Sequence, residues 1–422
     1  MIPAGIALAL VPVGTYLSRR GKMPRPGRGP IEPAGGMGLG AVGPPPNPPP
    51  QPVSDVPSTL SITRADVRYL VEYRPAGERT SPLTTKLLVE FDPNKRERIL
   101  KRIDELTMAA NVLALVARGK PNRGKPLPPD YLLASLKDIG GVIFDYFLSG
   151  NAAMKIRESR SQNLIIETND IEIPWEIMYD GSDFLSLKHY VGRALVVETD
   201  EKPMLWRGEI RKEVRTALII DPTDTLPAAK EEANLTECFS RFGTVDVYEG
   251  GSVDTVQGMK IFGRGTYDII HFAGHAEIDV EKPSRSSLGF SDGKLTAGEI
   301  KRIIDKNASK PKLIFVNACT SARESGEMEV EYQGHKISGL ASLFLKAGAL
   351  GYIGTTWTTF DRPAQFLASE FYARILSGEA VGMALTEARR KTFEAHPNDL
   401  SWASFILYGD PSARIFAHRV HS

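Results

Sequence analysis

An alternation of strand-like and helix-like segments is the feature that most constrains the fold of this 422-residue chain. From residue 215 onward, short and almost wholly apolar segments alternate with longer segments of helical periodicity. Such short apolar segments are typical of strands that are buried on both faces. The expected strands are 216–220, 245–248, 267–273, 312–318, 349–354 and 403–408. The alternation predicts an α/β fold with a largely parallel sheet and helices on both of its faces.

The chain upstream of this array divides by composition into further parts. Residues 1–20 form an apolar segment, and residues 21–57 are so rich in glycine and proline that we expect a disordered linker. Residues 58–125 are expected to form a small α/β N-terminal unit. The main domain would then span residues 130–415, with an upstream half at 130–205 and a C-terminal half at 210–415. Within the upstream half, the strands are expected at 163–168, 184–187 and 190–197.

Composition and charge narrow the function classes. Apolar residues make up 42% of the chain and charged residues 24%, which is typical of a soluble protein with a sizeable core. The formal net charge of +1 gives no support for direct binding to nucleic acid. Cys238 and Cys319 are the only cysteines, too few for a disulfide framework, so we expect a reducing, cytoplasmic location. We expect neither a cofactor nor a metal, because no ligand set falls at a recognised spacing.

Residues 2–17 are almost wholly apolar and are followed by Arg19, Arg20 and Lys22. The segment is short for a membrane span and is interrupted by two prolines. Two alternatives stay open, a weak N-terminal membrane anchor and a disordered start. In the first case the basic residues would keep the body of the chain in the cytoplasm. Any membrane contact would run through residues 2–17 alone.

Two residues with usable chemistry end two of the expected strands. His275 lies just past the strand at 267–273, and Cys319 just past the strand at 312–318. Ligands and chemistry gather at the carboxyl ends of parallel strands, so the imidazole and the thiol would meet if the strands are neighbours. We expect residues 273–276 to form a turn that exposes the His275 ring. A nearby imidazole increases the thiolate fraction of a cysteine and so makes it a nucleophile. Of the other candidates, Cys238 is expected to be a buried small hydrophobe, and His271 to pack inside or to satisfy a backbone group.

An ordered series of motifs surrounds these two residues. It comprises His271-Phe-Ala-Gly-His275, Ser287-Leu-Gly-Phe, Val316-Asn-Ala-Cys-Thr, Thr356-Trp357 with Asp361, and Trp402-Ala-Ser-Phe with Gly409-Asp-Pro. This series resembles the CHAT domain, a family that belongs with the caspases and separases. The resemblance covers about residues 130–415 and implies a caspase-like three-layer sandwich. It also implies a cysteine endopeptidase.

The resemblance assigns roles residue by residue. Cys319 would attack the scissile carbonyl, and His275 would protonate the leaving amine. The backbone N–H groups of Cys319 and Ala276 would hold the oxyanion. Caspases carry glycine where this chain has Ala276, a small departure from the pattern. No side chain is assigned as a third member, and a backbone carbonyl is expected to orient the imidazole.

Substrate choice is expected to come from the segment after the strand at 349–354. The pattern Trp357-x-x-x-Asp361 resembles separases, in which that Asp binds a basic side chain before the cut. A carboxylate in a walled pocket favours Arg or Lys through charge-assisted hydrogen bonds. We therefore expect Thr356, Trp357 and Asp361 to bind the substrate. The alternative for Asp361 is a place at the start of the helix that contains Pro363.

The leading hypothesis is thus a cysteine endopeptidase that uses a His–Cys dyad to cleave a protein substrate after a basic residue. One alternative is a catalytically silent caspase-like scaffold or regulatory binding module. A small-molecule cysteine hydrolase is the third. The expected partners are a protein substrate and an activating sensor or regulatory protein. Residues 60–125 are a candidate for such a sensor or regulatory element, attached to the domain within the chain itself.

Overall fold

The structure is a computed structural model, and one unit, Pro52–Ser422, holds all the residues it describes. These are 56–76, 85–90, 92–117, 130–159, 161–170, 172–195, 213–226, 235–240, 243–277, 279, 282–319, 334–357, 359, 361–397 and 399–416. The predicted segment 1–20 and nearly all of the predicted linker 21–57 lie outside them.

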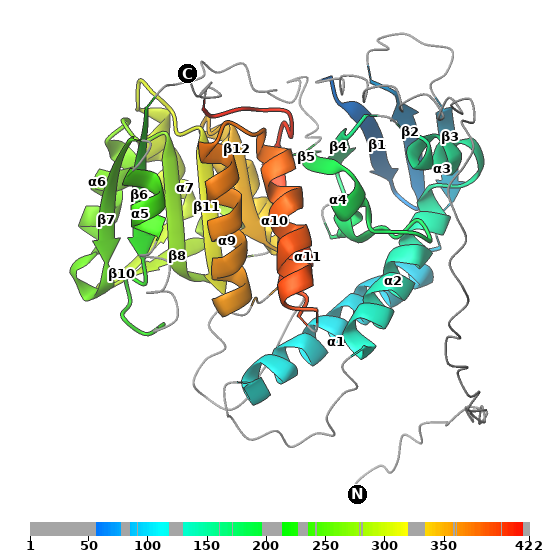
Figure 1. Ribbon diagram of the computed structural model, residues 1–422, viewed down its shortest axis with the longest axis horizontal. Helices are drawn as coiled ribbons and strands as arrows, with labels where there is room; N and C mark the ends of the chain where they lie inside the picture. The colour runs from blue at the N-terminus through cyan, green and yellow to red at the C-terminus, as the bar shows by residue number, and fades with distance from the viewer. Residues whose placement is uncertain are drawn as a thin grey trace, which may run out of the picture. The chain divides into compact units, whose positions relative to one another are not determined.

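The C-terminal half is built on parallel strands (Figure 1). Five of them are neighbours in the order β7 (Gly243–Glu249), β6 (Val214–Ile220), β8 (Ile269–Glu277), β11 (Leu313–Cys319) and β12 (Gly351–Thr355). The next strand, β13 (Phe405–Gly409), runs antiparallel to β12. The helices on one face are α6 (Thr255–Gly263), α7 (Ala297–Asp305) and α8 (Gly334–Lys346). The helices on the other face are α5 (Leu235–Ser240), α9 (Asp361–Leu376) and α10 (Val381–Ala395). The predicted α/β three-layer sandwich with a mostly parallel sheet is confirmed.

Strand β8 shows why these segments are apolar nearly throughout. Successive strand residues point to opposite faces of a sheet. Ile270 and Phe272 pack into the cluster that contains α6, α7 and α8, whereas Ile269 packs into the cluster with α9 and α10. Both faces of the strand are therefore covered, and no position is left for a solvated side chain until the strand nears its end.

The strands of the predicted N-terminal unit and of the upstream half extend the same sheet. In sheet order they are β5 (Tyr190–Leu195), β4 (Asn163–Thr168), β1 (Ser58–Ala65), β2 (Arg68–Arg74) and β3 (Thr85–Glu90). β5 meets β13 through the pair Arg193 and Tyr408. Because β1 pairs with β4, neither the sheet nor the core is interrupted between the predicted units 58–125 and 130–205. The division into those units stays a prediction.

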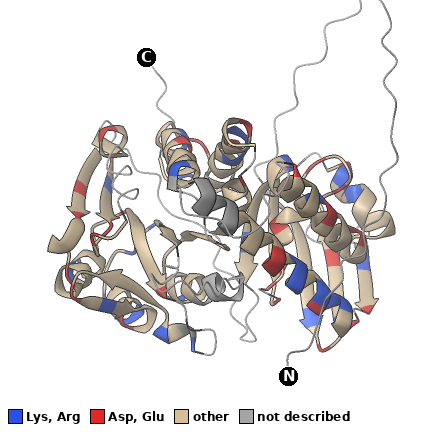
Figure 2. Ribbon diagram, turned by 90° about the horizontal axis from the view of Figure 1, so that it is seen from below, with Lys and Arg blue, Asp and Glu red and all other residues tan. Residues whose placement is uncertain are grey.

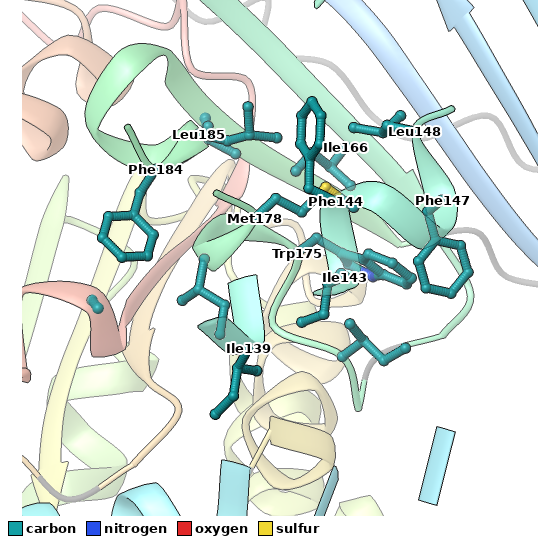
Figure 3. Packing of buried hydrophobic residues seen from close by; sticks show 14 of the residues in the cluster. Ile139, Ile143, Phe144, Phe147, Leu148, Ile166, Trp175, Met178, Phe184 and Leu185 are labelled. Carbon is teal, nitrogen blue, oxygen red and sulfur yellow. The ribbon is translucent and has the colours of Figure 1, made fainter. Parts of the chain in front are cut away.

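Helices α1 (Pro93–Ala117) and α2 (Tyr131–Phe147) cover this part of the sheet, and α3 (Gly150–Arg157) follows them. Figure 3 shows part of the core beneath them, in which aromatic side chains of α2 meet Trp175. The rings of Phe147 and Trp175 pack edge to face with their centroids 4.9 Å apart. Trp175 begins the short helix η1 (Trp175–Ile177), which follows Pro174.

One element of the upstream half differs from its prediction. Residues 184–187 were expected as a strand, but α4 (Leu185–Lys188) is a single helical turn, so that prediction is wrong. The backbone N–H of His189 donates to the carbonyl of Leu185 and closes the turn. The apolar character of the segment reflects burial, since the ring of Phe184 packs against Trp402 at a centroid distance of 5.3 Å.

Acidic and basic residues are interspersed along the same helices and strands (Figure 2), in keeping with the net charge of +1. Among the residues that the structure describes, no helix combines the length and the apolar character that a membrane crossing requires. The predicted membrane contact at residues 2–17 lies outside those residues.

Candidate active site

His275 and Cys319 occupy facing positions on neighbouring strands. β8 and β11 are parallel, and their register pairs Gly274 with Ala318 and His275 with Cys319. Neighbouring strands lie about 4.8 Å apart. The condition under which the two residues would meet, that their strands are neighbours, is fulfilled. Cys319 is the last residue of β11, and its side chain is not among the parts that the structure describes.

The surroundings of His275 differ from the prediction in one respect. Residues 273–276 were expected as a turn, but β8 continues through them to Glu277, so that prediction is wrong. The extension has a partner, because β9 (Ser287–Phe290) pairs antiparallel with Ala276 and Glu277. β9 is in turn paired with β10 (Gly293–Thr296). The His275 ring is consequently half-buried rather than exposed.

A chain of hydroxyl groups holds one nitrogen of His275. Its Nε2 is hydrogen-bonded to Thr225 Oγ1 at 2.7 Å, and Thr225 Oγ1 lies 2.8 Å from Thr223 Oγ1. The Thr223 hydroxyl donates to Asp221 Oδ1 at 3.0 Å. The other ring nitrogen, Nδ1, is buried and has no hydrogen-bond partner among the described residues.

Asp221 folds the loop that carries these threonines. It follows β6 directly, and its N–H donates to the carbonyl of Ala273 on β8 at 2.7 Å. The side chain is fully buried and accepts the backbone N–H groups of Thr225 and Leu226 at 3.2 and 2.8 Å. Its φ of +41° lies in the left-handed region, which Asp tolerates better than most residues. The carboxylate thus closes residues 221–226 into a turn that brings Thr225 against the imidazole.

The sequence prediction missed this loop, although it contains a usable signal. Asp221 stands immediately after a buried strand, the same position that singled out His275 and Cys319. A polar residue there reaches the edge of the sheet at which the other two lie. The link from Asp221 through two threonines to His275 could not be inferred, because it depends on the turn at 221–226.

Burial lowers the pKa of His275 below its ordinary value, and the negative charge of Asp221 acts in the opposite direction. The imidazole is therefore mostly neutral at pH 7 and able to accept a proton.

The family model of the CHAT domain matches residues 138–410, which is more than half of the chain. This chain belongs to the CHAT domain family. No curated protein sequence matches it.

Solved structures resemble the chain in fold. Separase in the separase–securin complex of Saccharomyces cerevisiae is similar at a TM-score of 0.50 and 11% identity, covering 85% of this chain. The Arg-specific cysteine proteinase gingipain R gives a TM-score of 0.45 at 12% identity, covering 86% of this chain and 79% of the proteinase. The chain spans 30% of the length of the separase chain it matches. The CHAT domain of this protein has a caspase-like cysteine-peptidase fold.

His271 and Cys238, the other histidine and cysteine considered as candidates, are packed within this CHAT domain. His271 is fully buried, stacks on Phe315 and is hydrogen-bonded through Nδ1 to the Tyr372 hydroxyl at 2.8 Å. Cys238 lies on α5, partly buried against the cluster that contains α9 and α10. The prediction that His271 packs inside is confirmed.

The predicted substrate-binding residues follow β12. The Thr356 hydroxyl donates to the carbonyl of Ser404 at 3.0 Å, and the Trp357 side chain is only 5% exposed. Asp361 is the first residue of α9, and its side chain is not described. A substrate-binding role for the three stays a prediction.

No group of three or more His, Cys, Asp or Glu side chains that could hold a metal ion occurs in the described part of the chain.

Proposed function

We propose that this CHAT protein is a cysteine endopeptidase in which Cys319 is the nucleophile and His275 the general acid and base. The observation that carries the proposal is the register of β8 and β11, which pairs the two residues at the carboxyl edge of a parallel sheet. The caspase-like fold of the CHAT domain supports the same assignment. A thiol beside a partly buried imidazole is a suitable nucleophile for an acyl group.

The proposed reaction has two halves. In the first, the Cys319 sulfur bonds to the scissile carbonyl carbon while His275 takes the thiol proton and passes it to the leaving amine. In the second, His275 takes a proton from water and the hydroxide adds to the thioester carbon. The C–S bond then breaks, the acid product is released, and Cys319 recovers the proton from His275. The backbone N–H groups of Cys319 and Ala276 would hold the oxyanion in both halves. The neutral His275 favoured by burial at pH 7 is the form that the first proton transfer requires.

We further propose that the substrate is a protein cut after Arg or Lys, with Asp361 as the recognition group at the start of α9. A carboxylate forms charge-assisted and, with Arg, bidentate hydrogen bonds to such a side chain. Thr356 and Trp357 would support this pocket from its buried side, in keeping with their burial. A sensor or regulatory protein would control access to it.

A peptide library with Arg and Lys at varied positions tests the proposal on the full-length protein. The expected result is cleavage that Cys319→Ala abolishes and that Cys238→Ala, the matched control at the other cysteine, leaves intact. Equal cleavage by the Cys319→Ala variant would contradict the assignment. Charge reversal by Asp361→Lys should remove cleavage after basic residues, and retention of that cleavage would place the recognition group elsewhere.

A further inference from the structure

We propose that Asp221, Thr223 and Thr225 form a relay that fixes the tautomer of His275 and leaves Nδ1 as the nitrogen that exchanges the proton. The chemical meaning of this proposal rests on the proposed function, whereas its evidence is the set of hydrogen bonds in the loop. Asp221 contacts Thr223, Thr223 contacts Thr225, and Thr225 contacts the imidazole, so the three act through one another as positioning residues. The relay takes the place of the backbone carbonyl that the sequence led us to expect.

The direction of each hydrogen bond follows from the hydrogens available. A carboxylate only accepts, and the side-chain contacts of Asp221 with Thr225 and Leu226 are with backbone donors, which suits the ionised form. Thr223 must therefore donate its single hydroxyl hydrogen to Asp221.

The same count of hydroxyl hydrogens determines which nitrogen of the neutral imidazole carries the proton. Because the Thr223 hydrogen is used, the 2.8 Å contact between the two threonines requires Thr225 to donate to Thr223. Thr225 has then used its own hydrogen and can only accept from His275 at 2.7 Å. The neutral imidazole consequently carries its proton on Nε2 and its lone pair on Nδ1.

The environment of Nδ1 agrees with that assignment. This nitrogen is buried and has no hydrogen-bond partner in the described part of the chain. A buried acceptor without a partner is unfavourable, so it is a position at which a donor is expected to bind. In the proposed reaction that donor is the Cys319 thiol first and the catalytic water later.

The relay also acts on the charged state of the imidazole. When Nδ1 accepts a proton, the positive ring keeps its Nε2–H bond to Thr225, and Asp221 lies at the far end of the chain of hydroxyls. The negative charge of Asp221 raises the pKa of His275 against the effect of burial. Loss of the carboxylate should therefore lower that pKa.

Long-range ¹H–¹⁵N correlation spectra of histidine-labelled full-length protein test the relay. The His275 signals are assigned by their absence in His275→Gln. Wild type and Thr225→Ser should show the Nε2–H tautomer, and Thr225→Val, which lacks the hydroxyl at nearly the same volume, should lose that preference. An Nδ1–H tautomer in wild type, or an unchanged tautomer in Thr225→Val, would overturn the proposal.

A second variant pair tests the carboxylate. Asp221→Asn keeps a side chain that tolerates the left-handed backbone and should lower the midpoint of the His275 titration. Asp224→Asn is the matched control, since Asp224 lies in the same loop with a φ of +55° but is not a member of the relay. Equal midpoints for Asp221→Asn and wild type would contradict the relay. Loss of the native spectrum elsewhere would identify a folding defect, which Thr225→Val at its exposed position avoids.

These readings do not depend on peptidase activity. If Cys319→Ala cleaves as wild type does, the proposed function fails while the tautomer measurement still decides the relay. If the function holds, Thr225→Val should lower kcat/KM by about 100-fold through misplacement of the imidazole, with Thr225→Ser close to wild type.

Discussion

His275 and Trp357 lie at the same edge of the sheet, but different parts of the molecule hold them in place. His275, near the end of β8, is fixed by the loop after β6, which belongs to the same half of the CHAT domain. Trp357, just past β12, packs in the core of the upstream half. A small apolar cavity beside it is lined by side chains of α1 and α2, including Ile103, Leu106 and Leu136.

This difference separates the two tasks of the proposed site, which are catalysis and substrate choice. The geometry of the proposed catalytic pair depends on β6, β8, β9 and β11, which all belong to the C-terminal half. The segment expected to choose the substrate depends on helices that lie more than 200 residues earlier in the chain. Changes in α1 and α2 should therefore alter substrate binding more than thiol reactivity, and changes around His275 should do the reverse.

The largest effect is expected at His275. His275→Ala removes the proton carrier and should lower kcat by about 10² to 10⁴ with KM nearly unchanged. Steady-state kinetics on a cleaved peptide provide the measurement. A rise in KM with kcat preserved would reverse the comparison and assign His275 to substrate binding.

The next effect tests whether α1 supports the segment around Trp357. Leu106 on α1 is 6% exposed and lines the cavity beside Trp357. Leu106→Ala should destabilise the protein by about 2–4 kcal/mol in urea unfolding and raise KM. Met108→Ala on the same helix is the control, since Met108 is 44% exposed and should change stability by less than about 0.5 kcal/mol. Equal effects of the two variants would show that α1 does not support the Trp357 segment.

The smallest effect is a loss of stability at low pH, which we expect from His189 in the upstream half. Burial lowers the pKa of His189 to about 4. Because the unfolded state then binds the proton more readily, the contribution of His189 to stability is complete well above pH 6.5 and is lost as the pH falls toward 4. The loss at pH 4.5 should be about 2 to 3 kcal/mol for this group. Urea unfolding of wild type and His189→Gln at pH 7 and 4.5 measures it, and an equal pH dependence of the two would contradict the assignment.

The sheet of the C-terminal half could be predicted because strands that are buried on both faces have a local sequence that is apolar nearly throughout. Ile269, Ile270 and Phe272 are apolar for that reason, and Cys319 marks the end of β11, whereas β8 runs two residues beyond His275. The errors arose where partners far away in the chain decide the structure. β8 is longer than expected because β9 pairs with its end, and 184–187 is helical where Phe184 packs against Trp402. The relay was missed because two hydroxyls separate Asp221 from His275.

The central claim is that β8 and β11 bring an imidazole to the Cys319 thiol, and thiol labelling tests it most directly. Full-length protein is treated with limiting iodoacetamide between pH 5.5 and 8, and the labelled cysteine is identified by peptide mass mapping. The account predicts selective labelling of Cys319 over Cys238 below pH 7, lost in His275→Ala. Equal labelling of both cysteines, or labelling of Cys319 that His275→Ala leaves unchanged, would contradict it.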